Sequence, residues 1–198
     1  MKNDNKQEPC GWCLSDPIYR DYHDSEWGVP LRDEQRIFEF LLLEGVQAGL
    51  SWITVLKRRE NYRLVYDNFD AQKIAAWSDQ RKQAILSDAR IIRNRLKVDS
   101  AQRNARAYLD MRDQGLTLTD YFWAFVEGEA IQNSFEKLSD VPAETPLSQQ
   151  ISKDLKQRGF NFVGPTIIYA HMQAMGLVND HLLSCPRHSA CAALRVNG

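Results

Sequence analysis

One stretch of this 198-residue chain, EFLLLEGVQAGLSWITVLKRRENY at residues 39–62, limits its fold more than any other. Ile37, Phe40, Leu41 and Glu44 are spaced i, i+3, i+4 and i+7, so a helix through them places a carboxylate on its apolar face. That carboxylate must find hydrogen-bond donors or lose its charge, because an unpaired buried charge is costly. The spacing therefore predicts a helix whose apolar face carries one acid.

Small residues and one large aromatic side chain follow this acid. Gly45, Ala48 and Gly49 leave the backbone bare, and Trp52 then restarts a helix. An acid, bare backbone and a flat ring indicate the wall of a pocket for a planar, electron-poor ligand. The alternative is a helix crossing that needs small residues, with Glu44 in an ion pair at its edge. These residues alone leave both interpretations open.

The rest of the chain also has helical periodicity. We expect helices over residues 33–45, 51–66, 74–77, 78–88, 105–111, 118–126, 145–158 and 165–175. Residues 127–144 are expected to be a long surface connection, and no strand pair, repeat or low-complexity tract is evident. The sequence therefore predicts an all-α fold, with one globular domain at 10–185, a disordered extension at 1–9 and a tail of unknown role at 186–198.

Charge is distributed unevenly along the chain. The formal net charge is −1, but residues 81–112 contain nine Lys or Arg against three Asp. A basic connection between two helices can bind phosphate through backbone N–H groups and Arg side chains. The alternative is a solvated helix pair whose acidic partners lie elsewhere. Without a long apolar run or an export signal, we expect a cytoplasmic protein with no membrane partner.

Metal-type ligands gather at the two ends of the chain. All four Cys (10, 13, 185, 191) and three of the four His (23, 181, 188) lie in the first 23 or last 18 residues. Disulfides are not expected without an export signal, and a metal such as zinc, which prefers thiolate and imidazole, is the physical alternative. His181 and Cys185 are four apart, so we expect them on one face of a helical turn.

Five blocks of sequence resemble the 3-methyladenine DNA glycosylase I family, a branch of the helix-hairpin-helix DNA glycosylases. They are CGW (10–12), DPIYRDYHDSEWGVP (16–30), LEGVQAGLSWITVLKRRENYR (43–63), NARAYL (104–109), and RGFNFVGPT through MQAMGLVNDH (158–181). The resemblance implies two helical lobes around a base pocket, with a hairpin near 88–97. It also implies monofunctional hydrolysis of the N-glycosidic bond of 3-methyladenine in double-stranded alkylated DNA, by a monomer that flips the base.

The resemblance also assigns roles to individual positions. The catalytic, base-recognising carboxylate is Glu44, and the base-binding aromatics are Tyr22, Trp52, Tyr19, Trp12 and Trp27. The DNA contacts are Gly49 and Leu50 beside the flipped nucleotide, and Arg90, Arg93, Arg95 and Lys97 in the phosphate-binding hairpin. The ligands of a structural Zn²⁺ are Cys10, His23, His181 and Cys185.

This chain departs from the family pattern in three places, one of which is the tail after Cys185, PRHSACAALRVNG, for which the family offers no interpretation. Arg90 stands where the family usually has a hairpin glycine, so the turn or its phosphate contact is expected to differ. Cys13, His188 and Cys191 are additional soft ligands, which leaves the metal-binding set open.

Two other classes of protein account for part of the pattern. A zinc-stabilised DNA-binding module without catalysis explains the basic connection and the metal ligands, but gives no reason for a carboxylate among aromatic rings. A redox or hydrolytic metalloenzyme centred on CGWC requires a cycling thiol pair or an exchangeable metal-bound water.

Overall fold

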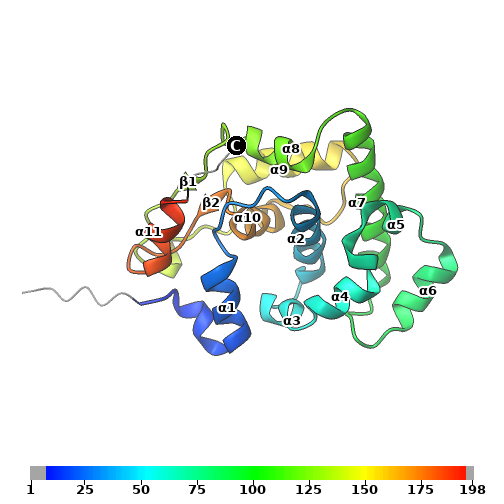
Figure 1. The fold of residues 1–198 in the computed structure, drawn as a ribbon, viewed down its shortest axis with the longest axis horizontal. Coiled ribbons are helices and arrows are strands. Elements are labelled where there is room, and N and C mark those ends of the chain that lie inside the picture. The colour runs from blue at the N-terminus through cyan, green and yellow to red at the C-terminus, as the bar shows by residue number, and fades with distance from the viewer. Residues whose placement is uncertain (1–7, 195–198) are drawn as a thin grey trace, which may run out of the picture.

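The computed structural model describes residues 8–194, which form eleven α-helices, three short 3-10 helices and one two-stranded sheet (Figure 1). The α-helices are α1 (Pro17–Ser25), α2 (Glu34–Gln47), α3 (Trp52–Leu56), α4 (Arg59–Val65), α5 (Ala71–Ala75), α6 (Asp79–Ser87), α7 (Arg95–Asp113), α8 (Leu118–Ala124), α9 (Pro146–Gln157), α10 (Pro165–Ala174) and α11 (Pro186–Ala192). The remaining elements are η1 (Gly11–Ser15), η2 (Asp67–Phe69), η3 (Leu138–Asp140), β1 (Ile131–Gln132) and β2 (Val178–Asn179). The prediction of a helical fold is confirmed.

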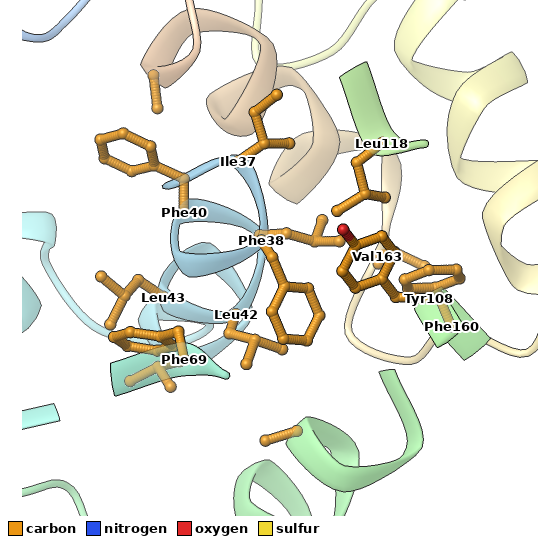
Figure 2. Close-up of a cluster of buried hydrophobic side chains, with 14 of the residues drawn as sticks. Ile37, Phe38, Phe40, Leu42, Leu43, Phe69, Tyr108, Leu118, Phe160 and Val163 are labelled. Atoms are coloured by element: carbon orange, nitrogen blue, oxygen red, sulfur yellow. The ribbon is translucent and has the colours of Figure 1, made fainter. Parts of the chain in front are cut away.

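Helix α2 lies at the centre of the hydrophobic core. Asp33 caps its first turn by accepting a hydrogen bond from the Arg36 N–H at 2.8 Å. Residues 37–46 are all buried, and Figure 2 shows Phe38 on one side of the helix and Phe40 and Leu43 on the other. Helices α3, α7, α8 and α10 contact it. A helix packed on all sides is held rigidly, so groups near its end have fixed positions.

The basic connection joins α6 to α7 at one end of the molecule, with α1 and α11 at the other (Figure 1). Helix α7 packs along α5 and also contacts α6 and α2. Residues 88–94 connect the two helices, and residues 95–97 of the hairpin expected at 88–97 lie in the first turn of α7.

The two ends of the described chain meet. Glu8 N–H donates to the Ser184 carbonyl at 3.1 Å, so the segment before η1 lies beside the segment before α11. Within the expected extension and tail, residues 1–7 and 195–198 lie outside the described residues. Most of the described tail is helix α11, which sequence analysis did not identify.

Three local expectations were wrong. The expected helix at 51–66 is divided into α3 and α4, because Arg58 leaves the helical conformation and buried Arg59 pairs with Glu39 at 2.6 Å. Strand β1, inside the expected surface connection, pairs in parallel with β2; two-residue strands have no alternation to detect. His181 and Cys185 lie in irregular backbone before α11, not in a helical turn.

Candidate functional site

A cavity of about 340 Å³ lies between the N-terminal segment and helices α2, α3 and α10. Helix α2 contributes Glu44, one turn before its end. All six side chains assigned to catalysis or base binding line this cavity: Trp12, Tyr19, Tyr22, Trp27, Glu44 and Trp52. The structure therefore brings together residues that are up to forty positions apart in the sequence.

The aromatic rings of the cavity support one another. The Trp12 ring lies edge-on to Tyr19 at 4.8 Å between centroids and to Trp27 at 5.1 Å. Tyr22 lies 5.5 Å from Trp52. Rings packed in this way hold their orientation, so the walls suit a flat ligand. The Trp52 Nε1 donor is buried without a hydrogen-bond partner among residues 8–194.

Glu44 is enclosed without a compensating charge. Its exposed fraction is 4%, and desolvation raises its pKa to about 8. Within residues 8–194 it forms no salt bridge, so the ion-pair alternative does not describe it. Burial raises the pKa of Tyr19 and of Tyr22, and the nearby Glu44 carboxylate acts in the same direction.

Gly45 is packed against a loop, not against a second helix. A Cβ added there would lie 3.2 Å from Phe162 Cβ and 3.5 Å from its carbonyl oxygen, and Phe162 lies between α9 and α10. The small residue is therefore needed for packing, as the alternative expected, but the contact is not a helix crossing. The acid before it lines the cavity.

Helix α10 forms a wall that sequence reasoning missed. Tyr169 and Gln173 line the cavity, and both donate to Oδ2 of buried Asp180, at 2.6 and 2.8 Å. Asn133 donates to Oδ1 of the same carboxylate at 2.6 Å. The i, i+4 spacing of the two lining residues and the acid in GLVNDH were the available signals. Asp180 thus orients one wall of the site.

Two more sets of residues line the cavity. The segment around η3, inside the expected surface connection, contributes Leu138, Val141, Pro142 and Ala143. Gln47 on α2 and Thr166 and Ala170 on α10 complete the lining.

A smaller hollow of about 170 Å³ extends along the turn after α2. It shares Glu44 and three other lining residues with the cavity and reaches the turn residues Ala48, Gly49 and Leu50. Gly49 has φ +79°, a conformation that favours glycine, and the Leu50 side chain is 40% exposed. The predicted DNA-inserting residues therefore lie beside the base cavity.

The hairpin presents exposed cations at the start of α7. Arg93 and Arg95 are exposed next to the first N–H groups of this 19-residue helix. Arg90, the departure from the family pattern, folds back on Asp88 with Nη2 2.6 Å from Oδ2. This contact lowers the pKa of Asp88 to about 2.

Lys97 is placed differently from these arginines. Its exposed fraction is 8%, and its Nζ donates to the Val46 and Ala48 carbonyls at 2.6 and 2.7 Å. A side chain buried in this way is not presented to a phosphate. We therefore do not count Lys97 among the direct DNA contacts assigned from the sequence.

Cys10, His23, His181 and Cys185 form a buried cluster whose ligand atoms all lie within 4.8 Å of one another. The two ring nitrogens are 3.2 Å apart, and Cys185 Sγ lies 3.6 and 3.7 Å from them. Ligands at roughly 2.0–2.3 Å from a tetrahedral ion are about 3.3–3.8 Å from each other, so these residues fit a metal.

Neighbouring groups orient the two histidines for this role. His23 Nδ1 contacts Asp24 at 2.7 Å, and His181 Nε2 contacts the Trp27 carbonyl at 2.9 Å. The other ring nitrogen of each histidine is the one in the cluster, an arrangement common around protein-bound metals. Because Trp27 also lines the cavity, the cluster supports the aromatic wall.

The additional soft ligands have other contacts. Cys13 Sγ contacts the Cys10 carbonyl at 3.0 Å, and His188 Nε2 contacts the Asn133 carbonyl at 2.8 Å. Cys191 accepts from Arg187 at 3.5 Å. A metal ion bound by all four residues would have a closed tetrahedral set with no position for an activated water, which argues against the metalloenzyme alternative.

A hairpin between helices, in the same domain as a cavity that combines aromatic rings with an acid, defines a class of protein: the helix-hairpin-helix DNA glycosylases, which enclose a flipped base. Comparison with known proteins identifies the branch. The methyladenine glycosylase family model matches residues 12–188, and the chain belongs to this family.

The chain also aligns with individual relatives over most of their length. The chain is 50% identical over 178 residues to DNA-3-methyladenine glycosylase 1 of Escherichia coli, covering 90% of this chain and 95% of that protein. A crystal structure of 3-methyladenine DNA glycosylase I matches with a TM-score of 0.89 at 47% identity, covering 90% and 98% of the two chains. The structure of a variant of 3-methyladenine DNA glycosylase I in complex with 3-methyladenine matches with a TM-score of 0.86 at 34% identity. The match covers 89% of this chain and 95% of that one. Among the described residues, every helix is too short or too polar to cross a bilayer.

Proposed function

We propose that this chain removes 3-methyladenine from DNA by enclosing the extruded base in the aromatic cavity, with Glu44 as the group that recognises it. Membership of the methyladenine glycosylase family supports the hydrolysis of an N-glycosidic bond in alkylated DNA. One observation carries the assignment of the site: a buried carboxylate shares a single cavity with six aromatic side chains.

Glu44 complements the charge of the alkylated base. N3-methylated adenine is cationic while it is attached to the sugar, so its glycosidic bond is already weak. Burial holds the pKa of Glu44 at about 8 in the empty cavity, which favours the neutral acid near pH 7. A cation in the cavity favours the ionised form, so Glu44 becomes the partner of the positive base as the base enters. This interaction favours the extruded cationic base over the stacked one; when the glycosidic bond breaks, its electron pair stays on the base, which departs neutral, and the attacking water releases a proton.

The aromatic rings supply attraction without sequence preference. Stacking contributes about 1–3 kcal/mol per base in nucleic-acid sites. A cationic purine over a ring also gains cation–π attraction. An unmodified purine has neither the charge nor the weakened bond, so selectivity comes largely from the lesion.

Water is the nucleophile in this reaction. The lining of the cavity includes no lysine that could form a Schiff base with the sugar. We therefore expect a monofunctional enzyme that leaves an intact strand with an abasic site.

Duplex DNA would lie across the turn after α2 and the hairpin. Leu50 is exposed beside Gly49 and suits insertion next to the extruded nucleotide. Arg93 and Arg95, together with the N-terminus of α7, suit contacts to phosphate. Arg90 stays assigned to this surface, with Asp88 as its partner in the free protein.

We assign the metal of the four-ligand cluster as zinc with a structural role. Two thiolates and two imidazoles are a typical zinc set, and a closed set supplies stability, not catalysis. Bound there, zinc would hold the N-terminal segment, with its cavity-lining aromatics, against the C-terminal segment. We further propose that the enzyme acts as a monomer on double-stranded DNA in the cytoplasm.

Incubation with methylated duplex DNA, followed by quantification of free 3-methyladenine, tests the proposal. Release should be lost in Glu44→Ala, while exposed Glu129→Ala, the matched control, retains it. Metal content should match wild type in both variants, and each should still unfold in one cooperative transition, which shows that it is folded. Undiminished release by a folded Glu44→Ala protein would remove Glu44 from the mechanism.

The hairpin assignment has a separate test. DNA affinity should fall with added salt. In Arg95→Gln, the plot of log K against log salt concentration should be less steep than in wild type by about one. A salt-independent affinity would contradict phosphate binding by this surface.

A further inference from the structure

The ammonium group of Lys97 joins two parts of the protein that are far apart in sequence. Lys97 lies in the first turn of α7, directly after the hairpin. Its Nζ donates to the carbonyl of Val46, near the end of α2, and to that of Ala48 in the following turn, at 2.6 and 2.7 Å. Within residues 8–194 it has no salt-bridge partner, so its described partners are both backbone carbonyls.

The end of a helix is a favourable place for this cation. The last carbonyls of α2 have no partner within the helix and carry its negative dipole end. Burial lowers the pKa of Lys97, so enclosing this group has a cost. Two short hydrogen bonds from a charged donor offset that cost, because charge-assisted bonds are the stronger kind.

These bonds also select the shape of the turn. Ala48 has φ −44° and ψ 115°, Gly49 has φ +79°, and Leu50 N–H donates to the Gln47 carbonyl at 2.6 Å. These values define a type II turn, in which the central carbonyl points opposite to its direction in a type I turn. The central carbonyl here is that of Ala48, so a flip of this peptide would break its bond to Lys97.

The turn held by Lys97 lies between the cavity and the DNA surface. Glu44 is two residues before Val46, and Leu50, 40% exposed, follows directly after Gly49. On the other side, the Lys97 N–H donates to the side chain of Asn94, the N-cap that ends the hairpin. One residue therefore connects the hairpin, the turn and the end of the helix that carries Glu44.

We propose that Lys97 is a positioning residue for base extrusion: it holds the turn at residues 47–50 in the type II conformation that presents Leu50 to the DNA stack, at a fixed place relative to the hairpin. The inference rests on the proposed role of Gly49 and Leu50 in the duplex. Lys97 acts through the turn and does not touch the base.

The proposal predicts that opening the duplex and binding the base can be separated. Lys97→Met keeps the length and apolar stem of the side chain but removes both hydrogen bonds. Three quantities are compared with wild type: single-turnover release of 3-methyladenine from methylated duplex DNA, release from methylated single strands, and affinity for free 3-methyladenine. Exposed Lys156→Met is the matched control and should change none of them.

We expect Lys97→Met to release base from duplex DNA at least about tenfold more slowly at saturating enzyme. Release from single strands should change by less than about threefold, and free-base affinity by less than about twofold. Lys97→Arg, which keeps a charged donor, should recover part of the duplex rate. A structural role alone would not produce this split between substrates.

Gly49→Ala provides a second route if Lys97→Met does not fold. An added Cβ at Gly49 meets no protein atom within 4 Å, so in the free protein its effect is confined to the positive φ of the turn. The same selective loss on duplex DNA is expected.

Three results would overturn the proposal. The first is a folded Lys97→Met protein that releases base from duplex DNA at a rate within twofold of wild type. The second is an equal loss of release rate on duplex and single-stranded DNA. The third is a loss of affinity for free 3-methyladenine that is as large as the loss of release rate. Failure of the proposed function itself would look different, because wild type would then release no 3-methyladenine from any DNA.

Discussion

The burial of Glu44 predicts how the stability of a Glu44→Gln variant depends on pH. Desolvation raises the pKa of this carboxyl from an ordinary 4.5 to about 8 in the folded protein. In the unfolded chain the pKa returns to its ordinary value, so unfolding releases a proton between these two pH values. Stability associated with Glu44 is therefore fully present below pH 4.5 and is lost as pH rises to 8.

The size of the effect follows from the two pKa values. One pKa unit corresponds to about 1.4 kcal/mol, so wild type loses about 3 kcal/mol between pH 4.5 and 7, and about 5 kcal/mol in all. Glutamine does not ionise, so the variant lacks this loss. Its own buried amide adds a contribution that does not vary with pH. The difference in unfolding free energy between variant and wild type should thus grow with pH, to the advantage of the variant.

Urea unfolding of the metal-loaded proteins at a series of pH values measures this difference. The other titrating groups and the metal ligands are common to both proteins, so their contributions cancel in the difference in unfolding free energy. Glu129→Gln, which removes an exposed carboxyl, should follow the wild-type curve at every pH. If the curve of Glu44→Gln also stays parallel to wild type between pH 5 and 8, Glu44 is solvated and the reasoning fails.

Three further perturbations test other parts of the site. Trp52→Ala should weaken binding of free 3-methyladenine by about 1–3 kcal/mol, or roughly 5- to 150-fold, in a fluorescence or calorimetric titration; unchanged affinity would mean that the base does not stack on this ring. Cys185→Ala should lower both the bound metal and the Tm, as measured by metal analysis and calorimetry, and a folded variant with one equivalent of zinc would remove Cys185 from the ligand set. Gly45→Val should reduce the free energy of unfolding by about 1–3 kcal/mol through overpacking against Phe162, and wild-type stability would show that this contact can relax.

The fold class and much of the site could be predicted because local patterns carried them. The apolar spacing around Glu44 identified α2, but its acid alone left a pocket and an ion pair at a helix crossing as alternatives. The family resemblance then supplied Tyr22 and the other rings, and the cavity contains all of them. The four metal ligands were likewise predicted as a set and lie together.

The remaining parts depend on tertiary contacts that leave little trace in the sequence. Tyr169 and Gln173 look like ordinary residues of a core helix until Asp180 is seen to bind both. Lys97 belongs to a basic run that suggested phosphate, yet its position against the end of α2 turns it inward. Side-chain chemistry predicted what these groups can bind, but only packing determined their partners.

A carbon-13 NMR titration of the Glu44 side-chain carboxyl, assigned by its loss in Glu44→Gln, tests the central claim most directly. In the free protein this resonance should titrate near pH 8, and saturating 3-methyladenine should shift it and change its titration. A carboxyl that titrates near 4.5 and does not respond to the base would mean that Glu44 neither lies in a water-poor cavity nor recognises the purine.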